Sequence, residues 1–475
     1  MFSSRTFLSR FHEYSRRRRL FGERSKIIVA VSGGVDSMVL LDLLTREREA
    51  LGLTLSVAHF NHQLRGSESD ADEHLVQQRG EQLGLEVYVD RAGTAECARQ
   101  ARQGIQEAAR NLRYSFFFKL LESSGFDLVA TAHNADDNAE TVLMNLFRGA
   151  GVQGLAGIPV LRPDRRIVRP LLFARREEIE AYAAAEGVSF RTDASNAKDD
   201  YTRNYVRHQI LPLVREQINP KVVETLQRTS ELFRELEGYL MHSARAALDV
   251  VTAESTPGEL KLSIPRLKGH PVLLQQYLVM LATQEVTGQR PDYEQVGRIL
   301  DLTDGKTGSW VTLPDRHGVY RDRDTLVIRA TEEPSEFSAH VLQNHRYAFR
   351  DFEFSSTLLS GGTPGPGTPG EVEYIDADQI PPGHLVLRSW SEGDWFIPLG
   401  MNARKKISDY FVDAKIPLYE KRHYPILETK DGTVIWLCGQ RIDDRFRLTD
   451  RTVNILKLEF HRAENGQKSE DHRGQ

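Results

Sequence analysis

The stretch Lys26–Leu43, KIIVAVSGGVDSMVLLDL, decides the fold of the chain. Its first part, Lys26–Val31, is almost entirely apolar and β-branched, which predicts a parallel strand buried on both faces. The next six residues, Ser32–Ser37, contain two adjacent glycines, and apolar residues then recur from Met38 at helical spacing. The pattern predicts a strand, a tight glycine turn and a helix.

The turn SGGVDS has the chemistry of a phosphate-binding loop. Gly33 and Gly34 let successive backbone N–H groups point into one concavity, and the helix adds the positive end of its dipole. The hydroxyls of Ser32 and Ser37 add donors, and Asp36 offers an oxygen ligand for magnesium on a polyphosphate. Neither a Walker GK[ST] nor the spaced glycines of dinucleotide folds are present. The hexapeptide resembles the pyrophosphate loop of ATP pyrophosphatases.

Length and composition narrow the class of protein. The 475 residues are enough for about three domains, and no run of about 18 apolar residues predicts a membrane span. Cys97 and Cys438 lie far apart and in no Cys/His cluster, which argues against disulfides and zinc and favours a cytoplasmic location. The net charge is −5, but Met1–Lys26 has eight Lys and Arg against two Glu, and Arg404–Lys457 is also basic. Such segments offer surfaces to nucleic acid.

The basic N-terminus has two interpretations. Its Arg- and Ser-rich, acid-poor composition is typical of a transit peptide. Its apolar residues, among them Phe7, Leu8 and Phe11, also predict an amphipathic helix against the first strand, and we favour this interpretation.

Strands and helices alternate through the N-terminal two-fifths of the chain. The apolar patterns predict strands at 53–60, 85–89 and 126–133, and helices at 69–83, 99–122 and 136–147. This alternation predicts an α/β fold with a doubly wound parallel sheet, whose ligands lie at the carboxyl ends of the strands. Three polar motifs fall at those ends: SGGVDS, HFNHQLR from His59 and HNADDNAET from His133.

The motif that begins at His133 carries the most polar chemistry after the phosphate loop. Asn134 can cap the following helix, and Asp137 and Glu140 project from one face of its first turns. Two carboxylates there can hold a magnesium ion or an ammonium group. Acidic residues also favour helix N-termini for electrostatic reasons alone, but their place beside the phosphate loop favours a functional role.

In their order and spacing, the motifs resemble the tRNA(Ile)-lysidine synthetase family. The resemblance rests on SGGVDS, AHFNHQLR (58–65), EAARNLRY (107–114), AHNADDNAET (132–141) and RGAG (148–151), and blocks at 169–172 and 193–212 extend it. The family more usually has His where Asn134 stands and Gln where Asn138 stands. A direct role is therefore not carried over to these two side chains.

The resemblance implies a reaction that uses ATP and Mg²⁺. ATP adenylates the C2 oxygen of the wobble cytidine of tRNA(Ile) with a CAU anticodon, and pyrophosphate leaves. The ε-amine of free L-lysine then displaces AMP, which gives lysidine and changes the codon read from AUG to AUA.

By the same resemblance, functional roles fall on particular residues. The catalytic residues are expected to be Asp36, His133, Asp137, Glu140 and Arg203, with Mg²⁺ on Asp36 and lysine between Asp137 and Glu140. The nucleotide is expected to contact Ser32, Gly33, Gly34, Val35, Asp36, Ser37, Ala58 and His59. The tRNA and lysine are expected to contact Asn61, Arg65, Arg110, Arg113, Asp137, Glu140, Arg203, Asn204 and Arg207. The alternative for the arginines is that they have no role in binding and only form salt bridges on helices or contact solvent.

The chain is expected to consist of several domains, two of which bind tRNA. We predict a catalytic domain at 1–216, a helical tRNA-binding domain at 217–335, a linker or irregular segment at 336–373, a β-rich tRNA-binding domain at 374–462 and a disordered tail at 463–475. The linker includes GGTPGPGTPG, 361–370. The β-rich segment resembles the family's C-terminal domain, although the family more often has Arg where Trp395 stands. A charged face of a dimerisation domain is the alternative there, and a homodimer is possible.

Three other functions share parts of the pattern. A tRNA thiolase needs well-placed cysteines, and neither Cys97 nor Cys438 lies in a strand-end motif. A glutaminase-fed amide ligase needs a nucleophilic cysteine that this chain does not offer. A non-catalytic RNA-binding module would leave Asp36, Asp137 and Glu140 without a role.

Overall fold

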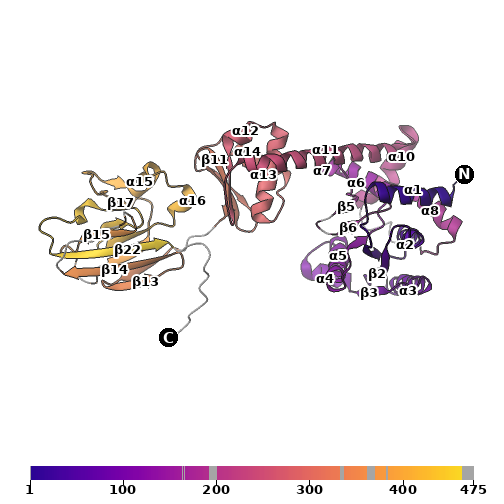
Figure 1. Cartoon of the computed structure of the whole chain (residues 1–475), viewed down its shortest axis with the longest axis horizontal. Coiled ribbons are helices and arrows are strands. Elements are labelled where there is room, and N and C mark those ends of the chain that lie inside the picture. Colours follow the sequence, from indigo (N-terminus) through magenta and orange to yellow (C-terminus); the bar gives the residue numbers. More distant parts are fainter. Residues whose placement is uncertain are drawn as a thin grey trace. The chain divides into compact units, whose positions relative to one another are not determined.

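The computed structural model describes residues 2–162, 164, 166–191, 201–331, 336–360, 368, 370–380, 383 and 385–462. The chain divides into two compact units, Met1–Leu240 and Met241–Gln475. Figure 1 labels their elements, with the parallel sheet of the first unit near the N-terminus and the strand-rich end of the second unit in orange and yellow.

A six-stranded sheet of order β3-β2-β1-β4-β6-β5 organises the first unit. Its strands are β1 (Lys26–Ala30), β2 (Thr54–Asn61), β3 (Val87–Arg91), β4 (Leu128–Ala130), β5 (Leu161–Arg162) and β6 (Ile167–Val168). All neighbours pair in parallel except β5 and β6. The chain adds strands on both sides of β1, which is the strand order of a doubly wound sheet.

Helices cover both faces of this sheet. They are α1 (Ser4–Arg17), α2 (Val35–Glu47), α3 (Ser67–Gln82), α4 (Thr94–Ala101), α5 (Ile105–Ser123), α6 (Ala135–Phe147), α7 (Val152–Leu155), α8 (Arg176–Glu186), α9 (Tyr201–Tyr205), a π-helical turn (Val206–Ile210), α10 (Leu211–Gln217) and α11 (Val222–Val251). Ile27 and Val29 of β1 pack in one apolar cluster with α1, α2 and α8, whereas Ile28 packs in another with α5. Successive residues of a strand face opposite sides, so the predicted α/β fold is confirmed.

The N-terminal segment forms the predicted amphipathic helix. Phe7 and Phe11 of α1 are buried, and the Phe7 ring centroid lies 5.2 Å from that of Tyr182 in α8. Arg16 and Arg17, in the last turn of α1, are exposed.

The single helix predicted over 99–122 is wrong, because the structure has two helices there. Arg102 ends α4 in the left-handed conformation at φ 52°, and Gly104 begins α5 in an extended conformation. These two departures from helical backbone, separated by Gln103, end the first helix and start the second.

The second unit begins with a mixed layer of helices and strands. It contains β7 (Thr252–Thr256), β8 (Glu259–Ser263), α12 (Ile264–Lys268), α13 (Val272–Thr287), α14 (Tyr293–Asp301), β9 (Trp310–Leu313), β10 (His317–Asp322) and β11 (Thr325–Ala330). Strands β7 to β11 form one sheet of the order β7-β8-β11-β10-β9. The segment predicted as helical, 217–335, thus also contains a sheet.

Two further sheets share the last apolar core. Their elements are β12 (Ser338–Val341), β13 (His345–Ala348), β14 (Phe352–Ser360), β15 (Val372–Asp376), β16 (Leu385–Ser389), β17 (Trp395–Phe396), β18 (Lys405–Lys406), α15 (Ile407–Asp413), α16 (Leu418–Lys421), β19 (Pro425–Thr429), β20 (Val434–Leu437), β21 (Arg441–Ile442) and β22 (Asn454–Arg462). One sheet has the order β12-β16-β19-β20-β21 and the other β13-β14-β22-β15, while β17 and β18 pair separately. Phe354, Trp436 and Phe460 are buried in the core between the two sheets.

The prediction of a linker at 336–373 is therefore wrong for β12, β13 and β14. Strand β14 pairs with β22 along its whole length, and the side chains of Phe352 and Phe354 enter the core. The apolar residues at these alternating positions were the signal that was missed. Most of the Gly/Pro-rich stretch 361–370, and the tail 463–475, lie outside the described residues. Among the residues that are described, no helix is long and apolar enough to cross a bilayer.

Candidate functional site

A cavity of about 290 Å³ opens where β1, β2 and β4 end. It lies at the sheet edge where the three polar motifs were expected to meet. The residues that line it are Ala30, Val31, Ser32, Gly34, Asp36, Ser37, Ala58, Phe60, His62, Arg113, Tyr114, Phe117, Thr131, Ala132, His133, Asp137 and Arg203.

The glycine loop has a backbone that its own residues hold in place. Gly33 has φ +92°, and a Cβ added there would meet the Asp72 side chain of α3 at 3.4 Å. Ser37 Oγ accepts a hydrogen bond from Ser32 N at 3.1 Å and donates one to the Gly34 carbonyl at 2.9 Å. The loop is thus held by hydrogen bonds among its own residues, at the N-terminus of α2.

Asp36, in the first turn of α2, lies at the centre of the polar groups. Its carboxylate accepts hydrogen bonds from Asn134 Nδ2 at 3.0 Å and from Arg176 Nη1 at 3.4 Å. Burial raises the pKa of Asp36, and Arg176 opposes this shift. The described residues contain no group of three or more His, Cys, Asp or Glu that could hold a metal ion. A single carboxylate completed by phosphate oxygens is, however, a common arrangement for Mg²⁺.

Asn134 joins the loop to helix α6. Asn134 Oδ1 accepts from Asp137 N at 3.0 Å, and Asp137 Oδ2 accepts from Asn134 N at 3.0 Å. This capping box fixes both side chains at the start of α6, so Asn134 caps the helix as predicted and also orients Asp36.

Two arginines from the segment after α8 clamp the carboxylates of α6. Glu140 accepts from Arg203 Nε at 2.7 Å and from Arg207 Nε at 2.6 Å. Asp137 Oδ1 accepts from the Nη2 atoms of the same two arginines at 3.2 and 3.1 Å. Arg203 lies in α9 and Arg207 in the π-helical turn, a distortion that often occurs at functional sites. We call this group of four side chains the arginine clamp.

The clamp separates the two carboxylates that were predicted together. Glu140 is only 1% exposed and does not line the cavity, whereas Asp137 does. The bonds to Glu140 are also the shorter ones. Glu140 therefore anchors the arginines, and Asp137 is the carboxylate that a ligand in the cavity can reach.

The histidines of the site are neutral. Burial, with Arg169 and Arg113 nearby, holds the pKa of His133 well below its usual range. Burial and Arg113 lower the pKa of His62 to about 4, and its Nδ1 lies 3.0 Å from Thr94 Oγ1. Burial also lowers the pKa of His59. Each imidazole thus offers one donor and one acceptor near neutral pH.

Several predicted contact residues lie outside the cavity lining. They are Gly33, Val35, His59, Asn61, Arg65, Arg110, Glu140, Asn204 and Arg207. Asn61 is buried, and its amide donates to Asp70 at 3.0 Å and to Glu73 at 2.9 Å. Arg65 pairs with Asp72 at 2.6 Å. The polar residues after β2 therefore hold α3 against the phosphate loop.

An aromatic wall of the cavity was not predicted. Phe60, Tyr114 and Phe117 line it, with the Phe60 ring centroid 4.7 Å from that of His62. Tyr114 belongs to the EAARNLRY motif. In a sequence, however, an apolar helix face is equally typical of core packing. The three rings are in fact also part of an apolar core cluster.

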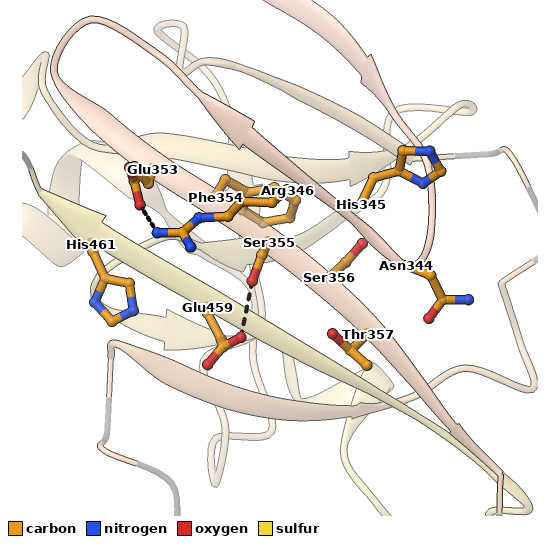
Figure 2. A pocket seen from close by; sticks show the side chains of 10 residues that line it. All are labelled: Asn344, His345, Arg346, Glu353, Phe354, Ser355, Ser356, Thr357, Glu459 and His461. Atoms are coloured by element: carbon orange, nitrogen blue, oxygen red, sulfur yellow. Dashed lines mark hydrogen bonds and ion pairs between the residues drawn. The ribbon is translucent and has the colours of Figure 1, made fainter. Parts of the chain in front are cut away.

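A second cavity, of about 340 Å³, lies over β13, β14 and β22 (Figure 2). Arg346 pairs there with Glu353, and Ser355 Oγ donates to Glu459 at 2.9 Å. Its charged groups thus pair among themselves, and none of the residues predicted for chemistry lies in it. The lining residues are Asn344, His345, Arg346, Glu353, Phe354, Ser355, Ser356, Thr357, Glu459 and His461.

Comparisons with known proteins identify the family of the chain. A family model described as a PP-loop domain matches residues 5–214, and a TilS substrate C-terminal domain model matches residues 385–459. A tRNA(Ile)-lysidine synthase of Parabacteroides distasonis is 35% identical and covers 94% of this chain and 98% of its own. That of Symbiobacterium thermophilum is 34% identical and covers 97% and 98%.

Among solved structures, a TILS C-terminal domain is 20% identical and covers 28% of this chain and 100% of its own, with a TM-score of 0.25. This likeness adds nothing to the sequence matches, which extend over nearly the whole chain at more than 30% identity. The chain belongs to the tRNA(Ile)-lysidine synthase family.

Proposed function

We propose that this protein ligates free lysine to C2 of the wobble cytidine of a tRNA(Ile) with anticodon CAU, through an adenylated cytidine. One observation carries the proposal: the phosphate loop and Asp137 line the same cavity. That cavity therefore offers both donors for a leaving pyrophosphate and a carboxylate for an amine.

The adenylation step uses the phosphate loop. Backbone N–H groups of the loop and the N-terminus of α2 stabilise the negative charge that develops on the leaving pyrophosphate. Asp36, with the phosphate oxygens, is the residue that would hold Mg²⁺, which supplies further charge neutralisation when it is bound. Asn134 and Arg176 keep the Asp36 carboxylate oriented.

The cavity side chains receive the base and the amine. The neutral imidazoles of His62 and His133 donate and accept hydrogen bonds without adding positive charge, so they do not repel a lysine ammonium group. Asp137 attracts that ammonium group. Because Arg203 and Arg207 already neutralise Asp137, lysine binds by displacing one of its two guanidinium contacts.

Sulfur transfer is disfavoured by the structure. Cys438 is fully buried, which raises its pKa well above the usual value. Cys97 lies in α4 and does not line the cavity. Nucleophilic thiols need the opposite environment, partly exposed and electropositive.

The experiment is lysine transfer to tRNA. The purified protein is incubated with ATP, Mg²⁺, labelled lysine and a tRNA(Ile) transcript with anticodon CAU, beside a tRNA(Met) transcript. We expect label in the first transcript only, with AMP and pyrophosphate released in equal amounts. Pyrophosphate release without lysine incorporation would overturn the choice of amine and leave the adenylation step standing. We further propose that the reaction takes place in the cytoplasm, whereas a homodimer stays a prediction.

A further inference from the structure

Three arginines lie around one tyrosine of the cavity wall, Tyr114. The guanidinium carbon of Arg110 lies 5.0 Å, and that of Arg113 5.9 Å, from the ring centroid of Tyr114. Arg169, which directly follows β6, lies close enough to Tyr114 for the two side chains to interact electrostatically. One buried ring thus holds cations from α5 and from the neighbouring strand end. We call Arg110, Arg113 and Arg169 the arginine track.

These cations have no carboxylate partner among the described residues. Arg169 is 3% exposed, its Nη1 donates to the Pro159 carbonyl at 2.6 Å, and its Nε has no hydrogen-bond partner. Arg113 is half-buried and lines the cavity. Burying positive charge without a counter-charge is costly, and burial lowers the pKa of both Arg113 and Arg169. Such an arrangement is stabilised by an anion that binds from outside.

The positions of the three side chains indicate the shape of that anion. Arg110 is exposed, Arg113 lies one helical turn further along α5 in the cavity wall, and Arg169 is buried and does not line the cavity. The charges therefore run from the surface into the cavity. The arginine clamp, by contrast, is fully engaged with Asp137 and Glu140.

We propose that the arginine track binds the phosphodiester backbone of the RNA strand that delivers the target base into the cavity. The inference rests on the proposed function for the identity of the RNA. Phosphates of ATP are the other source of the same chemistry. We assign RNA because the loop between β1 and α2 already provides phosphate donors, and because an exposed arginine followed by an inner one matches successive phosphates along a strand.

The test measures RNA and ATP binding separately in the full-length protein. The variants are Arg110→Gln, Arg113→Met and Arg169→Met, with Arg169→Lys retaining the charge. Arg99→Gln is the control, because Arg99 is an exposed arginine of α4 paired with Glu96. The probes are an anticodon stem-loop RNA with a CAU loop, titrated at several salt concentrations, and ATP with Mg²⁺.

Arg110→Gln and Arg113→Met should each weaken RNA binding about tenfold, as expected for the loss of one charge-assisted contact. The slope of log K against log salt should become shallower by about 0.7 for a single-stranded phosphate contact. ATP affinity should stay unchanged, and Arg169→Lys should retain the wild-type slope.

Two results would overturn the proposal. One is weaker ATP binding with an unchanged RNA slope, which would assign the track to the nucleotide. The other is wild-type behaviour of Arg110→Gln and Arg113→Met with both probes. Arg110→Gln decides the matter even where Arg169→Met does not fold, because Arg110 is exposed. Lysine transfer by the wild type is measured alongside, so a failure of the proposed function appears as absent transfer and leaves the slopes interpretable.

Discussion

At the scale of single residues, two asparagines that differ from the family pattern have structural tasks. Asn134 caps α6 and donates to Asp36. Asn138 is buried, donates to Ser230 Oγ at 2.9 Å and accepts from Ile158 N at 2.7 Å. A Cβ added at Gly157 would lie 2.3 Å from Asn138 Oδ1, so the two residues fit each other closely. The contacts of Asn138 therefore stabilise the fold, and none of them is with the cavity lining.

His62→Asn should reduce the sensitivity of stability to acid. The folded state keeps His62 neutral down to about pH 4, whereas the unfolded chain protonates it near 6.5. The unfolded state therefore binds more protons in that window, and wild-type stability falls as pH falls through it. Relative to the variant, the wild type should lose about 1 kcal/mol between pH 6.5 and pH 5.5. Urea unfolding at both pH values measures this. His59 and His133 are present in both proteins, so their contributions to the pH dependence cancel in the comparison. If the difference in unfolding free energy between wild type and variant is the same at both pH values, the prediction is wrong.

Asp36→Ala should abolish adenylation while tRNA binding survives. Loss of the carboxylate removes the proposed magnesium ligand, and the rate of pyrophosphate release should fall at least about 100-fold. Binding of tRNA should persist because phosphate-backbone contacts dominate its affinity. Pyrophosphate release and filter binding are measured on the same preparation. Unchanged release would remove Asp36 from the proposed mechanism.

At the scale of elements, the glycine loop and the arginine clamp use different means to hold a site. The loop depends on backbone conformation, since Gly33 combines a positive φ with close approach to Asp72. The clamp depends on charge, since four side chains from α6, α9 and the π-helical turn form five hydrogen bonds. We expect a side chain at Gly33 to disrupt the loop, and the loss of any charged side chain to disrupt the clamp.

Gly33→Ala should cost both stability and ATP binding. Alanine at a positive φ is strained by about 1 kcal/mol, and the new Cβ would lie in ordinary van der Waals contact with Asp72, 3.4 Å away. Gly84→Ala is the matched control, because Gly84 has φ +66° and nothing within 4 Å of the added Cβ. Both variants should lose similar stability in thermal unfolding, but only Gly33→Ala should weaken ATP binding, by about tenfold or more. Equal ATP affinities in the two variants would contradict the role of the loop backbone.

Arg207→Met should destabilise the protein by about 2 kcal/mol, because Glu140 is buried and loses two charge-assisted hydrogen bonds. The corresponding change in an exposed pair, Arg99→Met beside Glu96, should cost less than about 1 kcal/mol. Denaturant unfolding compares the two variants. If both substitutions lower the free energy of unfolding equally, the clamp contributes no more to stability than an exposed ion pair.

At the scale of the whole molecule, the chain keeps its chemistry in one unit. All of the cavity lining belongs to the first unit, Met1–Leu240. The second unit has its own apolar cores and the region that matches the substrate C-terminal domain model. We propose on this basis that the first unit carries the nucleotide chemistry and that the second unit binds the tRNA.

A fragment that ends with α11, residues 1–251, should therefore fold and bind ATP. Its ATP affinity should lie within about threefold of the full-length value, since every cavity residue is retained. Its affinity for the tRNA transcript should fall at least about tenfold, because contacts from the second unit are lost. Calorimetric titration and filter binding measure the two quantities. Undiminished tRNA affinity would exclude the second unit from binding.

Much of this architecture follows from local sequence. The run from Lys26 predicted β1, the glycine turn and α2, and the alternation of apolar segments predicted the parallel sheet, because both depend on residues adjacent in the chain. The strand β14 was missed although Phe352 and Phe354 alternate with polar residues, because so short an alternation identifies a strand only once its pairing with β22, about a hundred residues away, is known. The break between α4 and α5 was missed because Arg102 adopts a left-handed conformation that its residue type does not signal.

The sequence by itself determined the fold class, the phosphate loop and the family, because each is written in contiguous motifs whose chemistry depends on residue type and spacing. Only the tertiary structure decided which predicted residues share a cavity. It buried Glu140 as the anchor of Arg203 and Arg207, left Asp137 accessible, and gathered Arg110, Arg113 and Arg169 around Tyr114. Burial and pairing of charge depend on groups that are distant in sequence, and their energies are set by distance and desolvation, which no local pattern records.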